Sequence, residues 1–180
     1  MLTSTSSCRP PQTSAALDSE GWLHTGDIGE IDEDGYVKIV DRKKELIITA
    51  GGKNISPANL EAQLKTISLV GQACAIGDKR PFVSALVVLD PDVAPVWASK
   101  NGLGGKSLAE LAEEPAVIEA IEVGRAEVMQ KFSHAEQVKK VKVLGEEWLP
   151  DSDVLTPTSK LKRRGIHQRY AEQIEAFYSA

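Results

Sequence analysis

Two apolar runs, at residues 70–77 and 81–90, constrain the fold of this chain most. They read "VGQACAIG" and "PFVSALVVLD", and the short sequence "DKR" between them is a turn. Runs of this length and composition are typical of buried strands. Just before them, "SPANLEAQLKTI" offers Ser56 as a helix N-cap and Pro57 at the first helical position, with leucines at helical spacing. Together these segments predict a small sheet that carries a helix.

The flanking segments predict further strands and helices. Residues 21–40 alternate short apolar pieces around turn-forming residues, which predicts an antiparallel hairpin, and "ELIITA" at 45–50 predicts a further buried strand. Residues 91–133 have helical periodicity, "KKVKVLG" at 139–145 returns to strand, and the segment from 165 to 180 is an amphipathic helix. The predicted fold class is α+β, with a β-hairpin and a short central sheet flanked by helices.

Composition excludes several classes of protein. The chain has 180 residues, enough for one domain and part of a second, and its net charge of -5 disfavours general nucleic-acid binding. Its two cysteines, Cys8 and Cys74, lack the spacing of a disulfide framework or a zinc site, so we expect no metal and a cytoplasmic location. No apolar run is long enough to span a membrane. Residues 1–12, polar and without the apolar centre of a signal peptide, are expected to be a flexible tail or a cut end.

Two motif-like stretches carry little weight. "GLGGKS" at 102–107 ends like a phosphate-binding loop, but that pattern requires a glycine five residues before Gly105, where the chain has Lys100. We therefore expect a loop between helices. A second stretch mimics the spacing of a calcium-binding loop, but strand-like segments flank it and a hairpin turn explains it better; its residues are Glu30, Asp32, Asp34, Gly35 and Asp41.

Three further motifs follow one another in a particular order. They are "GWLHTGD", "DRKKELIITAGGKNISP" and "LTPTSKLKRR". In sequence and order they resemble the C-terminal motifs of the acyl-activating, adenylate-forming enzymes, especially the long-chain fatty acyl-CoA synthetases. The resemblance covers the chain from about Thr13 onward. It implies that residues 13–40 end a large N-terminal adenylation domain, that 41–44 form a hinge, and that 45–180 form a mobile C-terminal lid domain.

The resemblance implies a catalytic role for one lysine. Lys160 matches the family lysine that bridges the substrate carboxylate and the α-phosphate of ATP during adenylation. A lysine in a basic loop is otherwise usually solvated, so the role rests on the motif. The family commonly has glycine before this lysine, whereas this chain has Ser159, which leaves the geometry of the loop open.

Two residues are matched to the nucleotide. Asp27 of "HTGD" corresponds to the family carboxylate that accepts hydrogen bonds from the ribose hydroxyls of ATP or AMP, although an aspartate after glycine can also simply shape a turn. Arg42 corresponds to an arginine near the ribose and phosphates, for which its planar donor fork is suited. Its alternative is an ion pair with Asp41 or Glu45. His24 can line the nucleotide pocket or be structural.

The hinge and the CoA face are expected within residues 41–54. Family members alternate between two half-reactions by swinging this domain, and their hinge lies two residues after the motif arginine, which places it at Lys44 here. Gly51 and Gly52 match a backbone that approaches the pantetheine arm of CoA, and a tight turn is their other role. After this loop the family pattern "P-x-E-x-E" has Asn59 in place of the first glutamate, so one capping-box side chain is missing.

The function implied is the C-terminal part of a long-chain fatty-acid–CoA ligase, inactive alone. The whole enzyme would use fatty acid, ATP and CoA, with Mg-bound ATP held mainly by the N-terminal domain that this sequence lacks. The alternative is a non-catalytic module that docks on a separate synthetase or an acyl carrier. The basic stretch "KLKRRGIHQR" leaves peripheral contact with an anionic membrane surface open, without stable insertion.

Overall fold

The computed structural model describes residues 16–179. The tail expected at residues 1–12 and Cys8 lie outside the described residues. The chain divides into two compact units, with the boundary between Glu45 and Leu46.

The first unit is built on an antiparallel hairpin of β1 (Asp27–Ile31) and β2 (Val37–Arg42). The Asp32 carboxylate closes its turn by accepting hydrogen bonds from the backbone N–H groups of Asp34 and Tyr36 at 3.1 and 2.8 Å. Gly35 has a φ of +85°, which glycine adopts without strain. The predicted hairpin is therefore confirmed, and the Asp32 carboxylate stabilises its turn.

Large apolar side chains on this hairpin are exposed. Tyr36 is 74% exposed, Ile31 73%, Val37 66% and Ile39 62%. A two-stranded sheet is at best marginally stable in water unless one of its faces is covered. The hairpin therefore has an apolar surface and no core of its own.

We expect the two units to differ sharply in hydrogen exchange. Amides of residues 27–42 should exchange at rates close to those of an unfolded chain, because little apolar burial stabilises their hydrogen bonds. Amides of the buried sheet in the second unit should be strongly protected. Exchange of the intact chain, followed by mass spectrometry, measures both, and strong protection of the hairpin would contradict the expectation.

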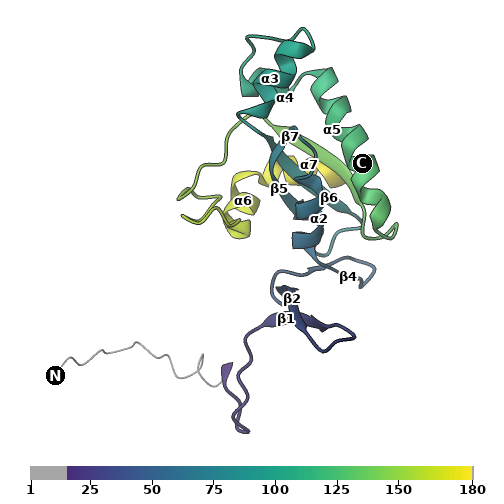
Figure 1. Ribbon diagram of the computed structural model, residues 1–180, viewed down its shortest axis with the longest axis vertical. Helices are drawn as coiled ribbons and strands as arrows, with labels where there is room; N and C mark the ends of the chain where they lie inside the picture. Colours follow the sequence, from purple (N-terminus) through teal and green to yellow (C-terminus); the bar gives the residue numbers. More distant parts are fainter. Residues whose placement is uncertain (1–15, 180) are drawn as a thin grey trace, which may run out of the picture. The chain divides into compact units, whose positions relative to one another are not determined.

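The second unit is organised around a three-stranded sheet (Figure 1). It contains β5 (Val70–Ile76), β6 (Val83–Leu89) and β7 (Val138–Leu144) in the order β5-β6-β7. β6 is antiparallel to β5 and parallel to β7. The hairpin of β5 and β6 and the strand at β7 were predicted from the sequence.

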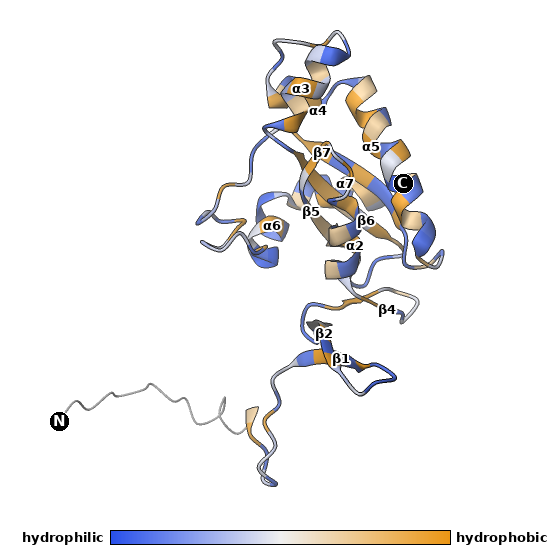
Figure 2. Cartoon of the chain, viewed as in Figure 1, coloured by the Kyte–Doolittle hydropathy of each residue, from blue (hydrophilic) through white to orange (hydrophobic). Residues whose placement is uncertain are grey.

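Each face of this sheet has its own core, because alternate side chains of a strand point to opposite faces. On one face Val83, Ala85 and Val87 pack with α2 (Pro57–Leu64), α3 (Val93–Lys100), α4 (Leu108–Ala112) and α5 (Pro115–Val128), which is followed by the short η1 (Met129–Lys131). On the other face Leu86 and Val88 pack with α6 (Arg163–Arg169) and α7 (Ala171–Tyr178). Figure 2 shows the strands as mainly hydrophobic.

Helix α2 begins as its sequence predicts. The Ser56 hydroxyl accepts the Asn59 N–H at 3.4 Å, and Pro57 is the first helical residue. Leu60 and Leu64 are fully buried. The N-cap is therefore present although position 59 lacks the glutamate of the family pattern.

Two predicted elements differ from the structure in their bounds. The buried strand expected at 45–50 is only β3 (Ile47–Ile48), and Ile48 is 49% exposed. The single helix expected from 165 onward is divided at Tyr170 into α6 and α7. Tyr170 is 2% exposed and accepts a hydrogen bond from Trp148 Nε1 at 2.8 Å. The break between the two helices occurs where this ring is buried. The apolar periodicity of the sequence does not predict the break.

The loop at 102–107 ends in the N-cap of helix α4. Ser107 Oγ accepts the Glu110 N–H at 3.3 Å, and Glu110 Oε2 accepts the Ser107 N–H at 2.8 Å, which forms a capping box for α4. Lys106 pairs with Glu114. The polar side chains of this loop are thus used by the fold. None of the helices among the described residues is long and apolar enough to cross a membrane.

Candidate functional site

Lys160 is the closing residue of a tight loop. This lysine loop, residues 156–160, is closed by the Thr156 N–H, which donates to the Lys160 carbonyl at 2.8 Å, and by the Lys160 N–H, which donates to Thr156 Oγ1 at 3.0 Å. Directly beneath it, Leu155 and Leu161 form a β-bridge and contribute to the core next to α6. Lys160 itself is exposed. The lower end of the loop is therefore anchored in the core, while the Lys160 side chain is exposed.

Ser159 occupies a conformation that favours glycine. Its φ is +58°, in the left-handed region that costs most L-residues free energy. This explains why glycine suits the position before the lysine. Serine nonetheless keeps the loop closed, since its N–H donates to the Thr156 carbonyl at 2.9 Å.

We expect Ser159→Gly to stabilise the chain by about 0.5–1 kcal/mol, because it relieves left-handed strain that exceeds the entropy lost by glycine. Urea unfolding of the two proteins would measure the difference. Thr158→Gly, in the same loop but not at a positive φ, is the control and should not stabilise. A loss of stability in Ser159→Gly would show that the strain at this position is negligible.

Gly51 and Gly52 lie in one loop, but the backbone favours glycine only at position 52. This glycine loop, residues 49–53, joins β3 to β4 (Asn54–Ile55), and the Gly52 N–H donates to the Thr49 carbonyl at 2.8 Å. Gly52 has a φ of +77°, so the turn itself favours glycine there. A Cβ on Gly51 would meet only Thr49 Oγ1, at 3.9 Å. The fold therefore does not require glycine at 51, and its bare backbone is exposed.

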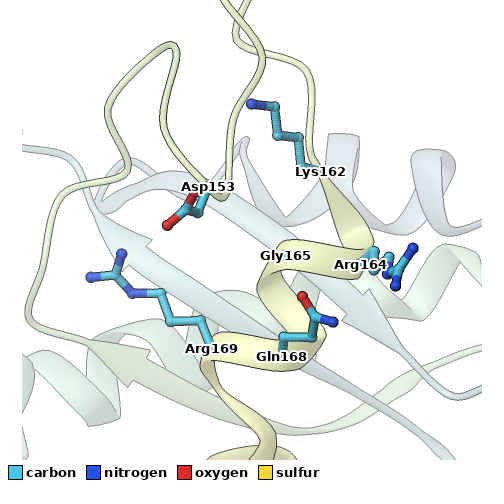
Figure 3. Close-up of a pocket in the computed structure, with 6 residues that line it drawn as sticks. All are labelled: Asp153, Lys162, Arg164, Gly165, Gln168 and Arg169. Atoms are coloured by element: carbon cyan, nitrogen blue, oxygen red, sulfur yellow. The ribbon is translucent and has the colours of Figure 1, made fainter.

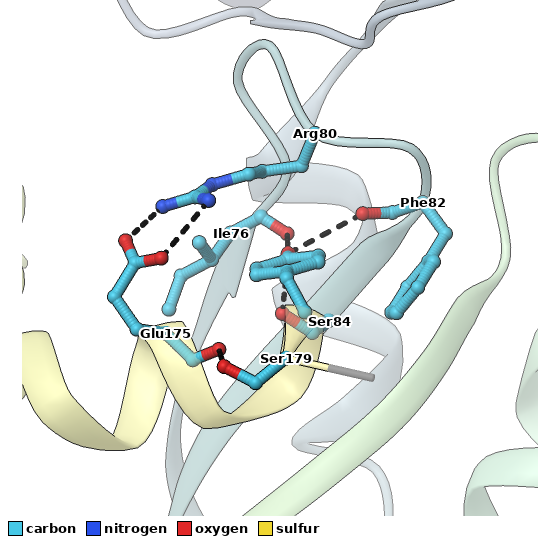
Figure 4. A network of polar contacts seen from close by, with 7 residues as sticks. Ile76, Arg80, Phe82, Ser84, Glu175 and Ser179 are labelled. Carbon is cyan, nitrogen blue, oxygen red and sulfur yellow. Dashed lines mark hydrogen bonds and ion pairs between the residues drawn. The ribbon is translucent and has the colours of Figure 1, made fainter.

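The turn between β5 and β6 supports the glycine loop. The Ala50 N–H donates to the Arg80 carbonyl at 2.9 Å, and the Lys79 N–H donates to the Ile48 carbonyl at 2.7 Å. The Arg80 guanidinium pairs with Glu175 of α7 (Figure 4). It also lies 4.7 Å from the centre of the Tyr178 ring. The glycine loop is thus connected through this turn to the C-terminal helix.

Tyr178 completes that support from inside the fold. Its hydroxyl lies 2.7 Å from Ser84 Oγ, and it donates toward the Ile76 carbonyl at 3.2 Å. Burial raises the pKa of Tyr178 above the ordinary value, so the phenol stays protonated and able to donate.

Lys53 and Asn54 are used within the second unit. Lys53 Nζ donates to Ser133 Oγ at 2.7 Å and lies 3.5 Å from a Glu136 oxygen. Asn54 is a strand residue, paired across β3 and β4 with Ile48. Lys53 thereby ties the glycine loop to the segment that follows α5.

In the first unit the structure brings Asp27 and Arg42 together. Arg42 Nε lies 3.3 Å from Asp27 Oδ1, and the two residues are opposite one another in the hairpin. A register shift between Ile28 and Gly29 inserts one extra residue on β2, without which residue 41 would face Asp27. The bulge has no clear sequence signal, so this pair was not predicted. His24 Nε2 lies 3.0 Å from Asp18 Oδ2.

Lys44 lies in an exposed turn at the end of the first unit. The Glu45 N–H donates to the Arg42 carbonyl at 2.9 Å, which makes Lys44 the third residue of the turn. The unit boundary falls one residue later, after Glu45. Asp27, Arg42 and Lys44 thus share one unit, while the glycine loop and Lys160 lie on separate segments of the other.

A hollow beside α6 was not anticipated from the sequence. It has a volume of about 700 Å³ and is open to solvent (Figure 3). Its lining contains three cationic side chains, but Lys162 Nζ already donates to the Ser152 carbonyl at 2.7 Å and Arg169 pairs with Glu146. We therefore assign it no anion site; its lining residues are Asp153, Lys162, Arg164, Gly165, Gln168 and Arg169.

Comparison with known proteins gives consistent matches. A family model described as "AMP-binding enzyme C-terminal domain" matches residues 44–180. The chain is 48% identical to a protein of Mycobacterium tuberculosis provisionally named fatty-acid–CoA ligase fadD11, over 95% of this chain and 30% of that protein. It is 40% identical to the long-chain-fatty-acid–CoA ligase FadD15 of the same organism, over 95% of this chain and 29% of that protein. The chain thus spans less than a third of the length of these relatives.

The fold has a solved counterpart. The adenylation domain of a carboxylate reductase from Mycobacterium chelonae superimposes with a TM-score of 0.79 at 24% identity, over 96% of this chain and 25% of that one. At this identity the match shows the fold alone. It agrees with the predicted α+β class and with the arrangement described above.

Proposed function

Because the chain belongs to the family of AMP-binding enzyme C-terminal domains, we propose that it is the C-terminal part of an ATP-dependent, AMP-forming long-chain fatty-acid–CoA ligase. The observation that carries the proposal is Lys160, an exposed cation whose backbone closes a tight loop directly above the buried Leu155. The identity to two fatty-acid–CoA ligases supports the choice of substrate class.

In the first half-reaction, a fatty-acid carboxylate oxygen attacks the α-phosphorus of ATP. A new P–O bond forms, the bond to the β-phosphate oxygen breaks, and pyrophosphate leaves. Two anions must meet before this happens, and a fixed cation between them stabilises the charge that develops. Lys160 Nζ supplies that cation.

The nucleotide contacts belong to the first unit. The Asp27 carboxylate accepts hydrogen bonds from the ribose hydroxyls, and Arg42 directs its planar guanidinium toward the ribose and phosphates. Their ion pair at 3.3 Å keeps the guanidinium from swinging away. Mg²⁺ would arrive bound to ATP, held mainly by the adenylation domain of the whole enzyme.

In the second half-reaction the CoA sulfur attacks the acyl carbonyl carbon. The C–S bond forms, the bond to the phosphate oxygen breaks, AMP leaves, and the thiol proton passes to solvent or a base. The exposed backbone at Gly51 allows the pantetheine arm to come close, because no Cβ blocks the approach. Rotation at Lys44 exchanges the lysine loop for the glycine loop at the reacting centre.

A second candidate function is docking without catalysis. It is favoured by the exposed apolar side chains of the β1–β2 hairpin, which fit a larger partner domain. In the ligase this partner is the adenylation domain that precedes the chain. In the alternative it is a separate synthetase or an acyl carrier.

A fusion separates these candidates. We expect the preceding part of FadD15 joined to this chain to catalyse fatty-acid-dependent exchange of pyrophosphate into ATP, whereas this chain alone should catalyse none. FadD15 with its own C-terminal part is the positive control. A folded fusion without exchange activity, beside an active control, would favour docking.

A further inference from the structure

One ion pair in the second unit is largely buried. Arg163 Nη1 lies 2.6 Å from Glu61 Oε1, and Nη2 lies 2.9 Å from Oε2, which is the paired geometry that suits a guanidinium. Glu61 is 7% exposed. Removing one member of such a pair leaves the other charge buried and uncompensated, so the pair strongly resists disruption.

This pair connects α6 to the rest of the unit. Glu61 belongs to α2, and its Oε1 also accepts the Ala75 N–H of β5 at 2.8 Å. Arg163 begins α6 and lies 3.7 Å from Cys74 Sγ of the same strand. The guanidinium therefore fixes the start of α6 against α2 and the edge of the sheet.

The connection from Arg163 back to Lys160 has little slack. The Lys162 N–H donates to the Val154 carbonyl at 2.8 Å, directly below the bridge of Leu155 with Leu161. A Cβ built on Gly165 would lie 1.9 Å from the Asp153 carbonyl oxygen, so α6 sits directly against the stem of the lysine loop (Figure 3). Any displacement of Arg163 must therefore move the loop.

We propose that Arg163 and Glu61 are positioning residues for Lys160, holding the lysine loop in the geometry needed for adenylation. The inference rests on the proposed function, in which Lys160 acts in the first half-reaction. A misplacement of about 1 Å can cost about a hundredfold in rate, so the pair acts on chemistry beyond its effect on stability.

The test uses a neutral double variant in the fusion with the preceding part of FadD15. Arg163→Met alone leaves Glu61 charged and buried and should destabilise the fold. Glu61→Gln combined with Arg163→Met removes both charges, and the amide oxygen of glutamine can still accept the Ala75 N–H. We expect the thermal midpoint to return close to that of the parent.

In that double variant we expect adenylation to fall about a hundredfold, while thioester formation from supplied acyl-adenylate changes less than about twofold. Adding Lys160→Ala should then cost little more, because both changes remove the same contribution. Arg125→Met, which removes a part-buried guanidinium paired with Glu122 in α5, is the matched control and should leave adenylation nearly unchanged.

Several results would overturn the inference. Normal adenylation in the stable double variant, or a full further loss on adding Lys160→Ala, would show that the pair does not act through this lysine. If Lys160→Ala alone leaves adenylation intact, the proposed function itself fails. If Lys160→Ala slows adenylation and the double variant does not, only the positioning role fails.

A second measurement applies if the double variant does not fold. Arg163→Lys keeps the charge but loses the paired geometry. In the 180-residue chain, its Ser159, Lys160 and Lys162 amides, which close the lysine loop and its stem, should exchange faster, while β5 and β6 stay protected. Unchanged exchange of these three amides would overturn the positioning role.

Discussion

In the fusion, Lys160→Ala should lower the rate of adenylation about a hundredfold to a thousandfold, the loss typical of one electrostatic group aimed at developing charge. The Lys160 side chain is exposed, and only its backbone and Thr156 close the loop, so the fold should survive. Fatty-acid-dependent exchange of pyrophosphate into ATP measures the effect. Lys100→Ala, an exposed lysine in the last turn of α3, is the control.

The same variant should leave the second half-reaction nearly intact. Gly51→Leu should show the reverse pattern, because a branched side chain would obstruct the pantetheine arm while the lysine loop stays in place. A Cβ at Gly51 would meet only Thr49 Oγ1, at 3.9 Å, so we expect the leucine variant to fold, and circular dichroism would check this. If Lys160→Ala slows thioester formation as severely as adenylation, the assignment of this lysine to the first step is wrong.

The elements that the sequence predicted well are those determined by local signals. Ser56 and Pro57 start α2 where N-cap chemistry places them, and the apolar runs around "DKR" form β5 and β6. Their patterns extend over many residues and are reinforced by burial, so local and tertiary preferences agree.

What the sequence did not predict depends on contacts between distant residues. Glu61 and Arg163 are 102 positions apart, and only the folded sheet brings α2 and α6 to the same edge. Asp27 faces Arg42 because β2 contains one extra residue, which shifts the pairing so that residue 42, and not residue 41, is opposite Asp27. Local patterns contain neither fact.

The family resemblance identified the candidate residues, and the structure gives physical reasons for two of its glycine positions. Gly52 and Ser159 both have positive φ, so glycine is favoured at each for the backbone alone. Gly51 has no such requirement. Its lack of a side chain is therefore the better indicator of a ligand that approaches the backbone.

The other large effect is expected at the joint between the two units. Lys44→Pro should slow one half-reaction about a hundredfold and affect the other much less. Proline fixes φ near -65° and, as the third residue of the turn from Arg42 to Glu45, forces Lys43 out of the helical region. The joint would then hold one conformation, and the half-reaction that needs the other would suffer.

Because Lys44 is exposed and outside both cores, the thermal midpoint of the fusion should change little. Lys44→Ala is the matched control: it removes the same side chain while keeping the backbone free, and both half-reactions should stay near the parent rates. Pyrophosphate exchange and thioester formation from acyl-adenylate are assayed separately, and the measured quantity is the ratio of the two rate losses in each variant. Equal losses in both half-reactions, or none in either, would place the joint elsewhere, since only a restricted rotation between two working conformations makes one step fail alone.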